Sequence, residues 1–389
     1  MVSLPRTAPP GATQLSGGAL HRHCRLASPE GALVLRRTGS RVLDSLSRAA
    51  EFHLQSLAWA AGVPTPEPLA AGPDWVLMRH HPGSAEPAVA FGADLDALTD
   101  QAALCLAQIH RLTPAEAACL PLVPPPVVDS AAATVAALRA ALDARHEAHP
   151  ALELALAQLG QALPPIVPPV LCHGDFRVGN LLIEDGRLEV VLDWEFAGWR
   201  DPAADIGWMR VAHWRRGRAA LQACGLAPMD QFLARYAAHG GREPCVARQL
   251  WWRLAGVVRW AVIALAQADR FAAGEDTSLA RAKTGRLLPR IEVEALAVAA
   301  RLLPGRAEGT VAPPPPWRCV GEQPSSAAIR KAGYPWPVDD PPEQPVPVPV
   351  WLDLTRAARE NRLTASQVEL LHSTLQARVA RLDAQETFT

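Results

Sequence analysis

The sequence predicts an α+β fold in which short strands come first and helices make up most of the rest. Over roughly the first 80 residues, short apolar stretches alternate with turns that contain glycine or proline, which is typical of paired strands. From Phe91 onward the apolar residues mostly recur at helical spacing, with one hairpin pattern over 181–192. These observations predict a small antiparallel sheet followed by a larger, mostly helical region.

The first strands and helix can be placed in order. Gly17 and Gly18 lie in a turn between stretches that can pair as strands, and residues 31–37 form an apolar strand that ends in arginine. Apolar residues at helical spacing predict a helix over 48–62, which the following prolines end. A further strand is expected over Trp75 to Met78, because residues 75–78 are apolar.

The helical region contains several expected helices. They cover 95–112, 131–162 with an interruption at Pro150, 208–214, 249–271 and 278–303. His110 is expected to be a buried hydrogen-bonding residue. Trp251, Trp252 and Trp260 are expected to pack in the core, with substrate stacking as the alternative.

The C-terminal part has a different composition. Prolines over 306–350 predict an extended linker. Thr364 and Gln367 have capping-box spacing and begin a helix over the last part of 351–389. One face of this helix is apolar: Val368, Leu371, Leu375, Val379 and Leu382. Such a stripe must be buried, either on this chain or in a homodimer or other partner, and the sequence leaves both open.

Composition excludes several classes of protein. The chain has 389 residues, 49% hydrophobic residues and a formal net charge of -1, which is typical of two or three globular units with no nucleic-acid or membrane partner. The seven cysteines lie singly, so neither a disulfide framework nor a zinc knuckle is indicated. Residues 1–20 lack an apolar signal core, and the apolar run over 254–266 contains Arg259 and is too short to span a bilayer. We expect a cytoplasmic enzyme.

One ordered set of residues has the layout of a phosphoryl-transfer site. Asp175 follows His173 and Gly174, Asn180 lies five residues on, and Asp193 comes after the predicted hairpin. An aspartate can accept the proton of an attacking hydroxyl, while an asparagine and a second aspartate offer hard oxygen ligands to Mg²⁺. The hairpin would bring Asn180 and Asp193 to the same end. A chance occurrence of His-Gly-Asp in a structural hairpin is the alternative, which the ordered set disfavours.

Other nucleotide-binding signatures are missing from the sequence. Gly-x-x-x-x-Gly-Lys-Ser/Thr does not occur, which excludes a Walker-type site, and Gly-x-Gly-x-x-Gly does not occur either. Lys283 and Lys331 are the only lysines, and the rest of the 38 Lys and Arg residues are arginine.

The pattern His-Gly-Asp-x-x-x-x-Asn, Asp-Trp-Glu and Asp-Pro-x-x-Asp over 173–205 resembles the aminoglycoside phosphotransferase and choline kinase family, which has a bilobal protein-kinase-like fold. The resemblance implies that Asp175 is the catalytic base and that Asn180 and Asp193 bind Mg²⁺. It also implies supporting roles for three residues: His173, Asp201 and Asp205.

The same resemblance extends to the N-terminal part of the chain. It implies that Arg36, where protein kinases have lysine, contacts the phosphates of ATP and that Glu51 orients it. Gly17 and Gly18 would approach the phosphates, and Met78 lies where backbone groups would bind adenine. Taken without the resemblance, Glu51 could be an exposed helix carboxylate and Gly-Gly a plain turn.

The resemblance implies an N-lobe over 1–83 and a helical C-lobe with the catalytic site over 84–305, before the linker and tail. We therefore expect an ATP- and Mg²⁺-dependent kinase that phosphorylates a hydroxyl of a small molecule. The motifs also resemble the phosphotransferase half of certain acyl-CoA dehydrogenase fusion proteins, which implies hydroxyacyl acceptors; aminoglycosides and amino alcohols stay open. The alternative is an inactive, nucleotide-binding scaffold that acts through its linker and terminal helix.

Overall fold

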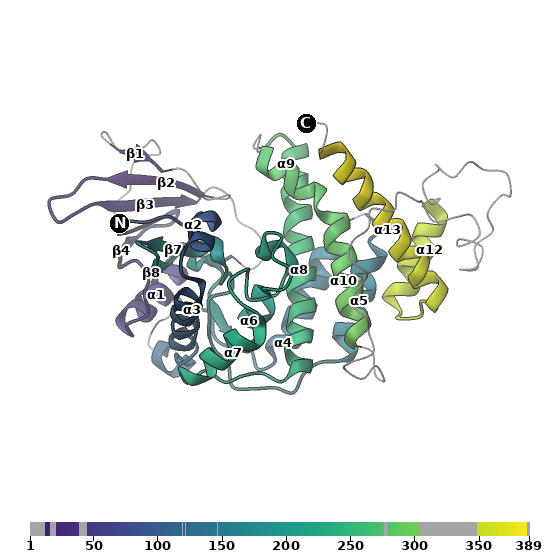
Figure 1. Ribbon diagram of the computed structural model, residues 1–389, viewed down its shortest axis with the longest axis horizontal. Coiled ribbons are helices and arrows are strands. Elements are labelled where there is room, and N and C mark those ends of the chain that lie inside the picture. Colours follow the sequence, from purple (N-terminus) through teal and green to yellow (C-terminus); the bar gives the residue numbers. More distant parts are fainter. Residues whose placement is uncertain are drawn as a thin grey trace. The chain divides into compact units, whose positions relative to one another are not determined.

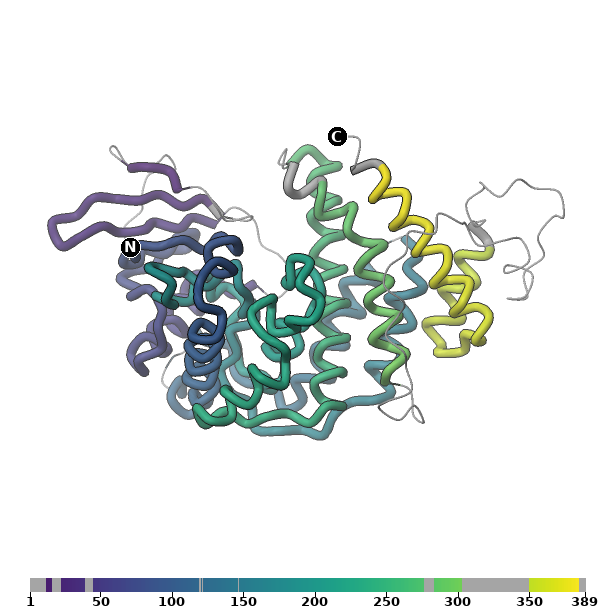
Figure 2. Tube along the Cα trace, in the orientation of Figure 1, coloured from purple at the N-terminus to yellow at the C-terminus, as the bar shows by residue number. Residues whose placement is uncertain are grey.

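The structure is a computed structural model that describes residues 12–15, 21–38, 45–118, 120, 122–145, 147–275, 279–302 and 348–386. The chain divides into two compact units, one from 1–131 and 165–253 and the other from 132–164 and 254–389. Figure 1 labels the elements and Figure 2 traces the chain through them. Gly17, Gly18 and nearly all of the proline-rich linker lie outside the described residues.

The first unit begins with a five-stranded antiparallel sheet in the order β1-β2-β3-β5-β4, of which Figure 1 labels β1 to β4. Its strands are β1 Thr13–Gln14, β2 His21–Leu26, β3 Leu33–Thr38, β4 Pro68–Ala71 and β5 Trp75–Arg79. Helix α1, Arg48–Ala60, contacts β4 and β5 and buries Leu54 and Ala58 completely. The hydroxyl of Ser47 accepts a hydrogen bond from the backbone N–H of Ala50 at 3.2 Å, which caps the start of this helix.

The rest of the first unit is mainly helical and surrounds two short strand pairs. Its elements are α2 Pro87–Gly92, α3 Leu95–Ile109, η1 Pro114–Ala117, β6 Val170–Cys172, η2 Val178–Asn180, β7 Leu181–Glu184, β8 Arg187–Val191, η3 Trp194–Phe196, β9 Gly198–Arg200, α6 Ala203–Met209, η4 Ala212–Arg215 and α7 Met229–Ala238. Helix α3 contacts β6, β8 and α7, and its Leu98, Leu106 and Ile109 are fully buried. This helix therefore supports the two strands that lead into the predicted catalytic residues.

The predicted hairpin over 181–192 is confirmed. Strands β7 and β8 pair antiparallel, and Asp185 and Gly186 have φ angles of 49° and 75° in the turn between them. Two successive residues with positive φ are what a two-residue hairpin turn requires, and Asp-Gly is well suited to it.

The second unit is a packed group of helices. They are α4 Ser130–Asp143, the main part of α8 Val246–Ala272, α5 Pro150–Gln161, α9 Leu279–Arg286, α10 Leu288–Leu302, α12 Val348–Arg359 and α13 Ala365–Glu386. Helix α5 contacts α10 and α12, and α10 contacts α13. Inside this unit, the carboxylate of Glu153 binds the guanidinium of Arg359 at 2.8 Å and also contacts Arg139.

The terminal helix covers its apolar stripe with its own chain. Leu371 and Leu375 are fully buried in a cluster with residues of α5 and α10, and Val368 and Val379 pack against the same cluster. Both halves of the capping box are present: the backbone N–H of Thr364 donates to the Gln367 side chain at 2.9 Å, and that of Gln367 donates to the Thr364 hydroxyl at 3.2 Å. The stripe alone therefore gives no reason to expect a dimer.

Three stretches differ from the expected helices. Helix α12 begins at Val348, inside the linker that was expected to be extended up to residue 350, because proline is tolerated in the first turn of a helix. Residues 208–214 were expected as one helix, but α6 ends at Met209 and η4 follows, because Val211 adopts an extended backbone conformation with ψ 131°. Helix α7 was not expected, although Phe232, Leu233 and Tyr236 lie at helical spacing and are buried. Trp251, Trp252 and Trp260 are buried, as expected for core packing.

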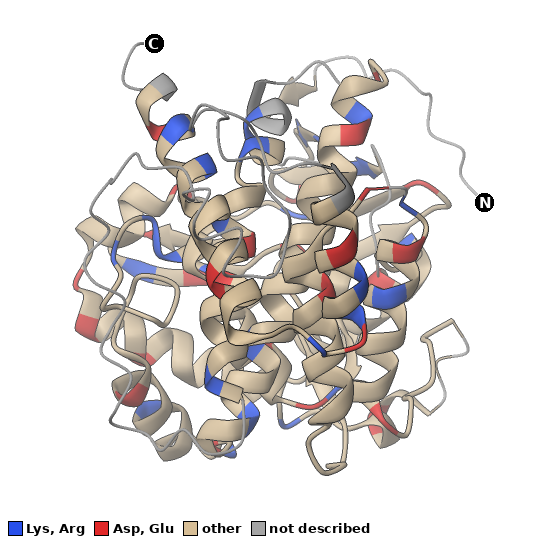
Figure 3. Cartoon of the chain, turned by 90° about the vertical axis from the view of Figure 1, so that its right-hand side faces the viewer, with Lys and Arg blue, Asp and Glu red and all other residues tan. Residues whose placement is uncertain are grey.

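Charges are mixed along the chain. On the side that Figure 3 shows, basic and acidic residues are interspersed along the ribbons and do not gather into one large patch of either sign. None of the described helices combines the length and the apolar character that a membrane crossing needs.

Candidate active site

The loop that carries Asp175 follows strand β6, which pairs with β9. Gly174 has a φ of 78°, and a Cβ atom added to it would lie 2.2 Å from the carbonyl oxygen of Phe196. Both the backbone conformation and the lack of space require glycine at this position. The tight turn places His173 and Asp175 on a loop held close to the chain around η3.

The carboxylate of Asp175 is buried among three hydrogen-bond donors. Asn180 Nδ2 donates to Oδ2 at 2.7 Å, and Trp208 Nε1 donates to Oδ1 at 2.7 Å. Arg177 Nε lies 2.9 Å from Oδ1 and 3.2 Å from Oδ2. These contacts fix the orientation of the carboxylate. Arg177 and Trp208 were not among the predicted site residues; Arg177 lies inside the motif, but no sequence signal marked Trp208.

The hairpin brings Asn180 and Asp193 to one end, as expected. The backbone N–H of Leu192 donates to the carbonyl oxygen of Asn180 at 2.8 Å. Asp193 is the residue after Leu192, so this hydrogen bond keeps Asp193 and Asn180 at the same end of the hairpin. The Asn180 amide nitrogen faces Asp175, which leaves its oxygen directed away from that carboxylate. Asp193 itself has a left-handed backbone with φ 68°, a conformation that aspartate tolerates better than most residues.

Arg36 and Glu51 form a buried ion pair, so Glu51 is not an exposed helix carboxylate. Arg36 Nη1 also donates to Asp193 Oδ1 at 2.7 Å. Glu51 contacts Arg48 as well, and Arg48 Nη2 lies 3.5 Å from a carboxylate oxygen of Glu195. Burial and the nearby charge of Arg36 lower the pKa of Arg48 to about 10. Alternating charges thus connect the sheet, helix α1 and the segment after Asp193.

His173 connects the loop that carries Asp175 to the segment that precedes Asp193. Its backbone N–H donates to Asp205 at 2.7 Å, and its Nε2 lies 3.0 Å from the carbonyl oxygen of Leu192. Its Nδ1 accepts a hydrogen bond from the backbone N–H of Asp175 at 3.2 Å. Burial lowers the pKa of His173, and a neutral ring with its proton on Nε2 satisfies both contacts. The ring therefore connects the Asp175 loop to the residue before Asp193.

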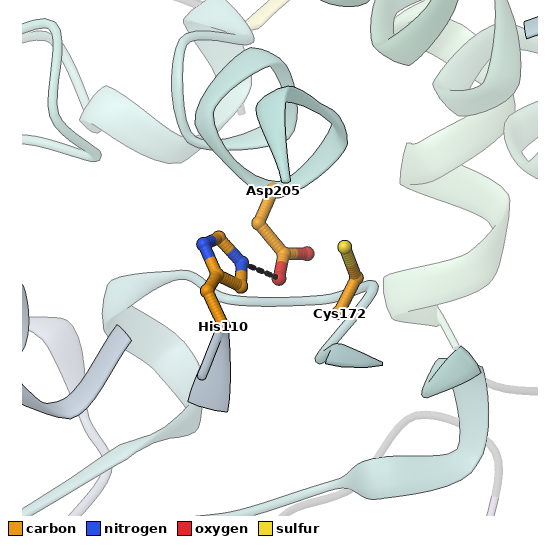
Figure 4. A group of neighbouring side chains, drawn as sticks. All are labelled: His110, Cys172 and Asp205. Atoms are coloured by element: carbon orange, nitrogen blue, oxygen red, sulfur yellow. Dashed lines mark hydrogen bonds and ion pairs between the residues drawn. The ribbon is translucent and has the colours of Figure 1, made fainter. Parts of the chain in front are cut away.

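Asp205 supports this loop, and Figure 4 shows its carboxylate bonded to His110. Its carboxylate accepts the backbone N–H of Gly174 at 2.8 Å in addition to that of His173, and His110 Nε2 lies 3.1 Å away. The other ring nitrogen of His110 lies 2.7 Å from the hydroxyl of Tyr236. Burial by itself would raise the pKa of Asp205, but these hydrogen bonds to its ionised form bring the pKa below its usual value. His110 is a buried hydrogen-bonding residue, as expected.

Three buried side chains near this loop are His110, Cys172 and Asp205 (Figure 4). Their ligand atoms lie within 4.8 Å of one another, which could suggest a metal site. Each is already engaged: Cys172 Sγ lies 3.4 Å from the carbonyl oxygen of Asp201, and the two others take part in the network above. Burial raises the pKa of Cys172 well above its usual value, which favours the neutral thiol that donates to this carbonyl oxygen. This group is structural.

Asp201 was expected to support this loop, but its carboxylate bonds to α6 and to the first part of α8. Its carboxylate accepts from Trp252 Nε1 at 2.8 Å and from the backbone N–H of Ala203 at 2.9 Å, and it contacts Arg248. Met78 lies in β5 opposite Val34 of β3 and is partly buried.

Replacing Asp205 by asparagine should lower the free energy of unfolding by roughly 1–3 kcal/mol at neutral pH, because an amide cannot accept as many hydrogen bonds as the buried carboxylate. The folded-state pKa is lowered, so this stabilisation is present above the unfolded pKa of about 4 and is lost as the pH falls through the folded value. Urea unfolding at several pH values measures it. Asp74→Asn, at an exposed position, is the control; equal effects from both variants would contradict this role.

Comparison with known proteins gives a consistent picture. A family model described as the phosphotransferase enzyme family matches residues 11–250. A Ralstonia eutropha protein assigned as an aminoglycoside phosphotransferase has a similar structure, with a TM-score of 0.58, 19% identity, and coverage of 76% of this chain and 94% of that one. A choline/ethanolamine kinase family protein from Mesorhizobium loti has a TM-score of 0.50 at 18% identity, covering 76% of this chain and 92% of that one. At these identities the likeness shows a shared kinase-like fold.

A curated relative matches a shorter segment. Acyl-CoA dehydrogenase family member 10 of Mus musculus is 39% identical over 67 residues. The match spans 17% of this chain and 6% of the length of that protein.

Proposed function

The chain belongs to the phosphotransferase enzyme family, and we propose that it transfers the terminal phosphoryl group of ATP to a hydroxyl of a small molecule in a Mg²⁺-dependent reaction. The observation that carries this proposal is the arrangement around Asp175: one oriented carboxylate beside Asn180, with Asp193 at the adjacent end of the same hairpin. Acid–base and metal-binding oxygens gathered in this way suit phosphoryl transfer.

The residues present fit a divalent cation. The amide oxygen of Asn180 and the carboxylate of Asp193 are hard oxygen ligands of the kind that Mg²⁺ prefers. The nitrogen of the Asn180 amide donates to Asp175, so the same contact that orients Asp175 turns the amide oxygen toward other partners. Bound Mg²⁺ would neutralise charge on the phosphates of ATP.

In the proposed reaction, Asp175 accepts a hydrogen bond from the acceptor hydroxyl and aligns it with the terminal phosphorus. The acceptor oxygen forms a bond to phosphorus, the bond from phosphorus to the bridging oxygen of ADP breaks, and Asp175 takes the hydroxyl proton. Arg36, held by Glu51, would contact the phosphates. In the structure Arg36 instead engages Asp193, and phosphate oxygens would compete with that carboxylate for the guanidinium.

A hydroxyacyl compound is the acceptor class that we propose. The supporting observation is the short sequence match to acyl-CoA dehydrogenase family member 10. Residues 201–300 contain nine acidic and fourteen basic side chains, and a pocket for polycationic aminoglycosides would favour the opposite balance. A mass-spectrometric screen of hydroxylated metabolites with ATP and Mg²⁺ tests the reaction; absence of any phosphorylated product would contradict it.

The two neighbouring arginines of β3 should differ in their effect on catalysis. Arg36 is buried against Glu51 and Asp193, whereas Arg37 lies on the opposite face of the strand. Arg36→Met should therefore raise the KM for ATP strongly, and Arg37→Met should raise it only mildly. Steady-state kinetics of both variants measures the difference. A larger effect from Arg37→Met would place the phosphate-binding cation on the other face.

A further inference from the structure

Four buried side chains connect Asp193 to the start of helix α1 through successive ion pairs. In order along the pairs they are Arg36, Glu51, Arg48 and Glu195. Glu195 lies two residues after Asp193, so the pairs begin and end on the same segment of the chain. The side chains of these four residues are 1–4% exposed, whereas that of Asp193 is 31% exposed. Asp193 is therefore the member through which the group can act on a ligand.

Arg48 divides its two terminal nitrogens between two carboxylates. Its Nη1 bonds to Oε2 of Glu51, and its Nη2 lies 3.5 Å from Oε2 of Glu195. The planar guanidinium holds these donors in a fixed geometry, which the single ammonium group of a lysine does not reproduce. Arg48 thereby relates the position of Glu195 to that of Glu51.

Glu51 is divided in the same way, with one oxygen for each of two arginines. Its Oε1 contacts Nη2 of Arg36, and its Oε2 contacts Nη1 of Arg48. Because each oxygen has its own cation, the carboxylate cannot turn toward one arginine without loosening its contact with the other. Arg48 thus helps to fix the Glu51 oxygen that holds Arg36, whose Nη1 bonds to Asp193 at 2.7 Å.

The backbone around Glu195 joins the same elements. The backbone N–H of Leu46 donates to the carbonyl oxygen of Glu195 at 2.8 Å, directly before Ser47, which caps α1. Helix α1 also contacts η3. A separation of 3.5 Å is long for a hydrogen bond, but buried charges attract each other more strongly than charges in water. The backbone bond and the ion pair together hold the start of α1 on the segment that carries Asp193.

The charges of these five side chains do not balance, because two arginines face three carboxylates. The excess is negative, and Asp193 is the exposed carboxylate at which a cation can reduce it. When Asp193 binds Mg²⁺, Arg36 can turn from it to the phosphates of the nucleotide. The pair of Arg48 and Glu195 takes part in neither exchange, so it can keep the two elements together throughout.

We propose that Arg48 and Glu195 are positioning residues for the transfer reaction. Without touching a substrate, they hold the segment of the proposed Mg²⁺ ligand Asp193 at a fixed place relative to the arginine that meets the phosphates. This inference rests on the proposed function, since it takes Asp193 to bind Mg²⁺ and Arg36 to contact ATP. It gives the glutamate that follows Asp193 and Trp194 a role of its own.

The test compares metal binding and nucleotide binding in Glu195→Gln, which keeps the size of the side chain and removes its charge. Calorimetry with ADP and a chelator measures the affinity for the nucleotide alone. Titration of the ADP-saturated chain with Mn²⁺, followed by the paramagnetic resonance of free Mn²⁺, measures metal affinity, because Mn²⁺ accepts the same oxygen ligands as Mg²⁺.

Glu195→Gln should weaken Mn²⁺ binding by about 10–100-fold, as is typical when a residue that orients a metal ligand is lost. The affinity for ADP without metal should stay close to that of the wild type, because Arg36 keeps its partner Glu51. Wild-type Mn²⁺ affinity in Glu195→Gln overturns the inference. So does an equal loss of both affinities, which a general disturbance of the fold would cause.

Glu153→Gln is the matched control. Like Glu195, Glu153 is a buried carboxylate paired with arginine, but it lies in the second unit and contacts Arg139 and Arg359 there. Both substitutions should lower the free energy of unfolding in urea, whereas only Glu195→Gln should weaken Mn²⁺ binding. An equal loss of Mn²⁺ affinity in Glu153→Gln would contradict the positioning role.

Arg48→Lys provides a second variant that does not depend on the folding of Glu195→Gln. It keeps the charge and loses the forked geometry, so it should also weaken Mn²⁺ binding. The double variant should bind Mn²⁺ no more weakly than the more severe single variant, because residues that act as a unit are not additive. Wild-type affinity in Arg48→Lys, or losses that multiply in the double variant, would show that the two residues do not act together.

Phosphoryl transfer is scored separately in the metabolite screen. Mn²⁺ binding that depends on Glu195, without any phosphorylated product from the wild type, supports the positioning role and contradicts the proposed reaction. Product formation by the wild type, with Mn²⁺ binding unchanged in Glu195→Gln, gives the opposite outcome. A wild-type chain that binds no Mn²⁺ overturns the inference, whatever the screen shows.

Discussion

Replacing Asp175 by asparagine should lower turnover by roughly two to four orders of magnitude and change the affinity for ATP little. The substitution keeps the size of the side chain but removes the charge that accepts the hydroxyl proton. It also puts an amide nitrogen among the donors of Arg177, Trp208 and Asn180, so at least one of these contacts is lost. Initial rates at saturating ATP, with a separate nucleotide-binding titration, measure the two effects.

Asp185→Asn is the matched control for this experiment. Asp185 is exposed in the turn of the neighbouring hairpin, where asparagine before glycine is equally suitable. Its turnover should equal that of the wild type. If Asp175→Asn instead lost nucleotide affinity and turnover together, Asp175 would have a structural role and the proposed reaction would be wrong.

Removing the second carboxylate should have the other large effect: Asp193→Ala should abolish Mg²⁺-dependent turnover while the chain still folds. Asp193 is the charged member of the proposed ligand pair and also contacts Arg36, which keeps Glu51 as a partner when Asp193 is lost. Alanine is poorly suited to a φ of 68° and should cost about 1–2 kcal/mol of stability.

Asp193→Asn separates the loss of the charge from the strain of the backbone, because asparagine tolerates the left-handed conformation and removes only the charge. Both variants should be inactive, and the asparagine variant should be closer to the wild type in its free energy of unfolding. Magnesium titrations of activity, together with urea unfolding, provide both readouts. Near-normal turnover in either variant would rule out Asp193 as a metal ligand.

Local sequence signals predicted the parts of the molecule that depend on neighbours along the chain. The Asp185-Gly186 turn, the cap of α13 by Thr364 and Gln367, and the burial of His110 were all found in the structure. In each case the residue types at short spacing decide the conformation. The Asp-Gly pair in particular is a strong local signal for a two-residue hairpin turn.

Contacts between distant parts of the chain could not be predicted in this way. Trp208 donates to Asp175 from 33 residues away, and nothing in its local sequence marks it as different from the core tryptophans. The terminal stripe around Leu371 packs on α5 and α10, but periodicity shows only that such a face must be buried and not against what. The contact of Arg177 with the Trp214 ring likewise depends on how η4 lies beside the loop.

The most direct test of the central claim is whether this chain attaches a phosphoryl group to a hydroxyl of a small molecule. The wild-type chain is incubated with ATP, Mg²⁺ and a set of hydroxylated metabolites that includes hydroxyacyl compounds, and the products are analysed by mass spectrometry. The account predicts a phosphorylated product that requires both ATP and Mg²⁺ and is lost in Asp175→Asn and Asp193→Asn. A product formed equally by the wild type and both variants would contradict it, as would ATP binding with no product from any compound.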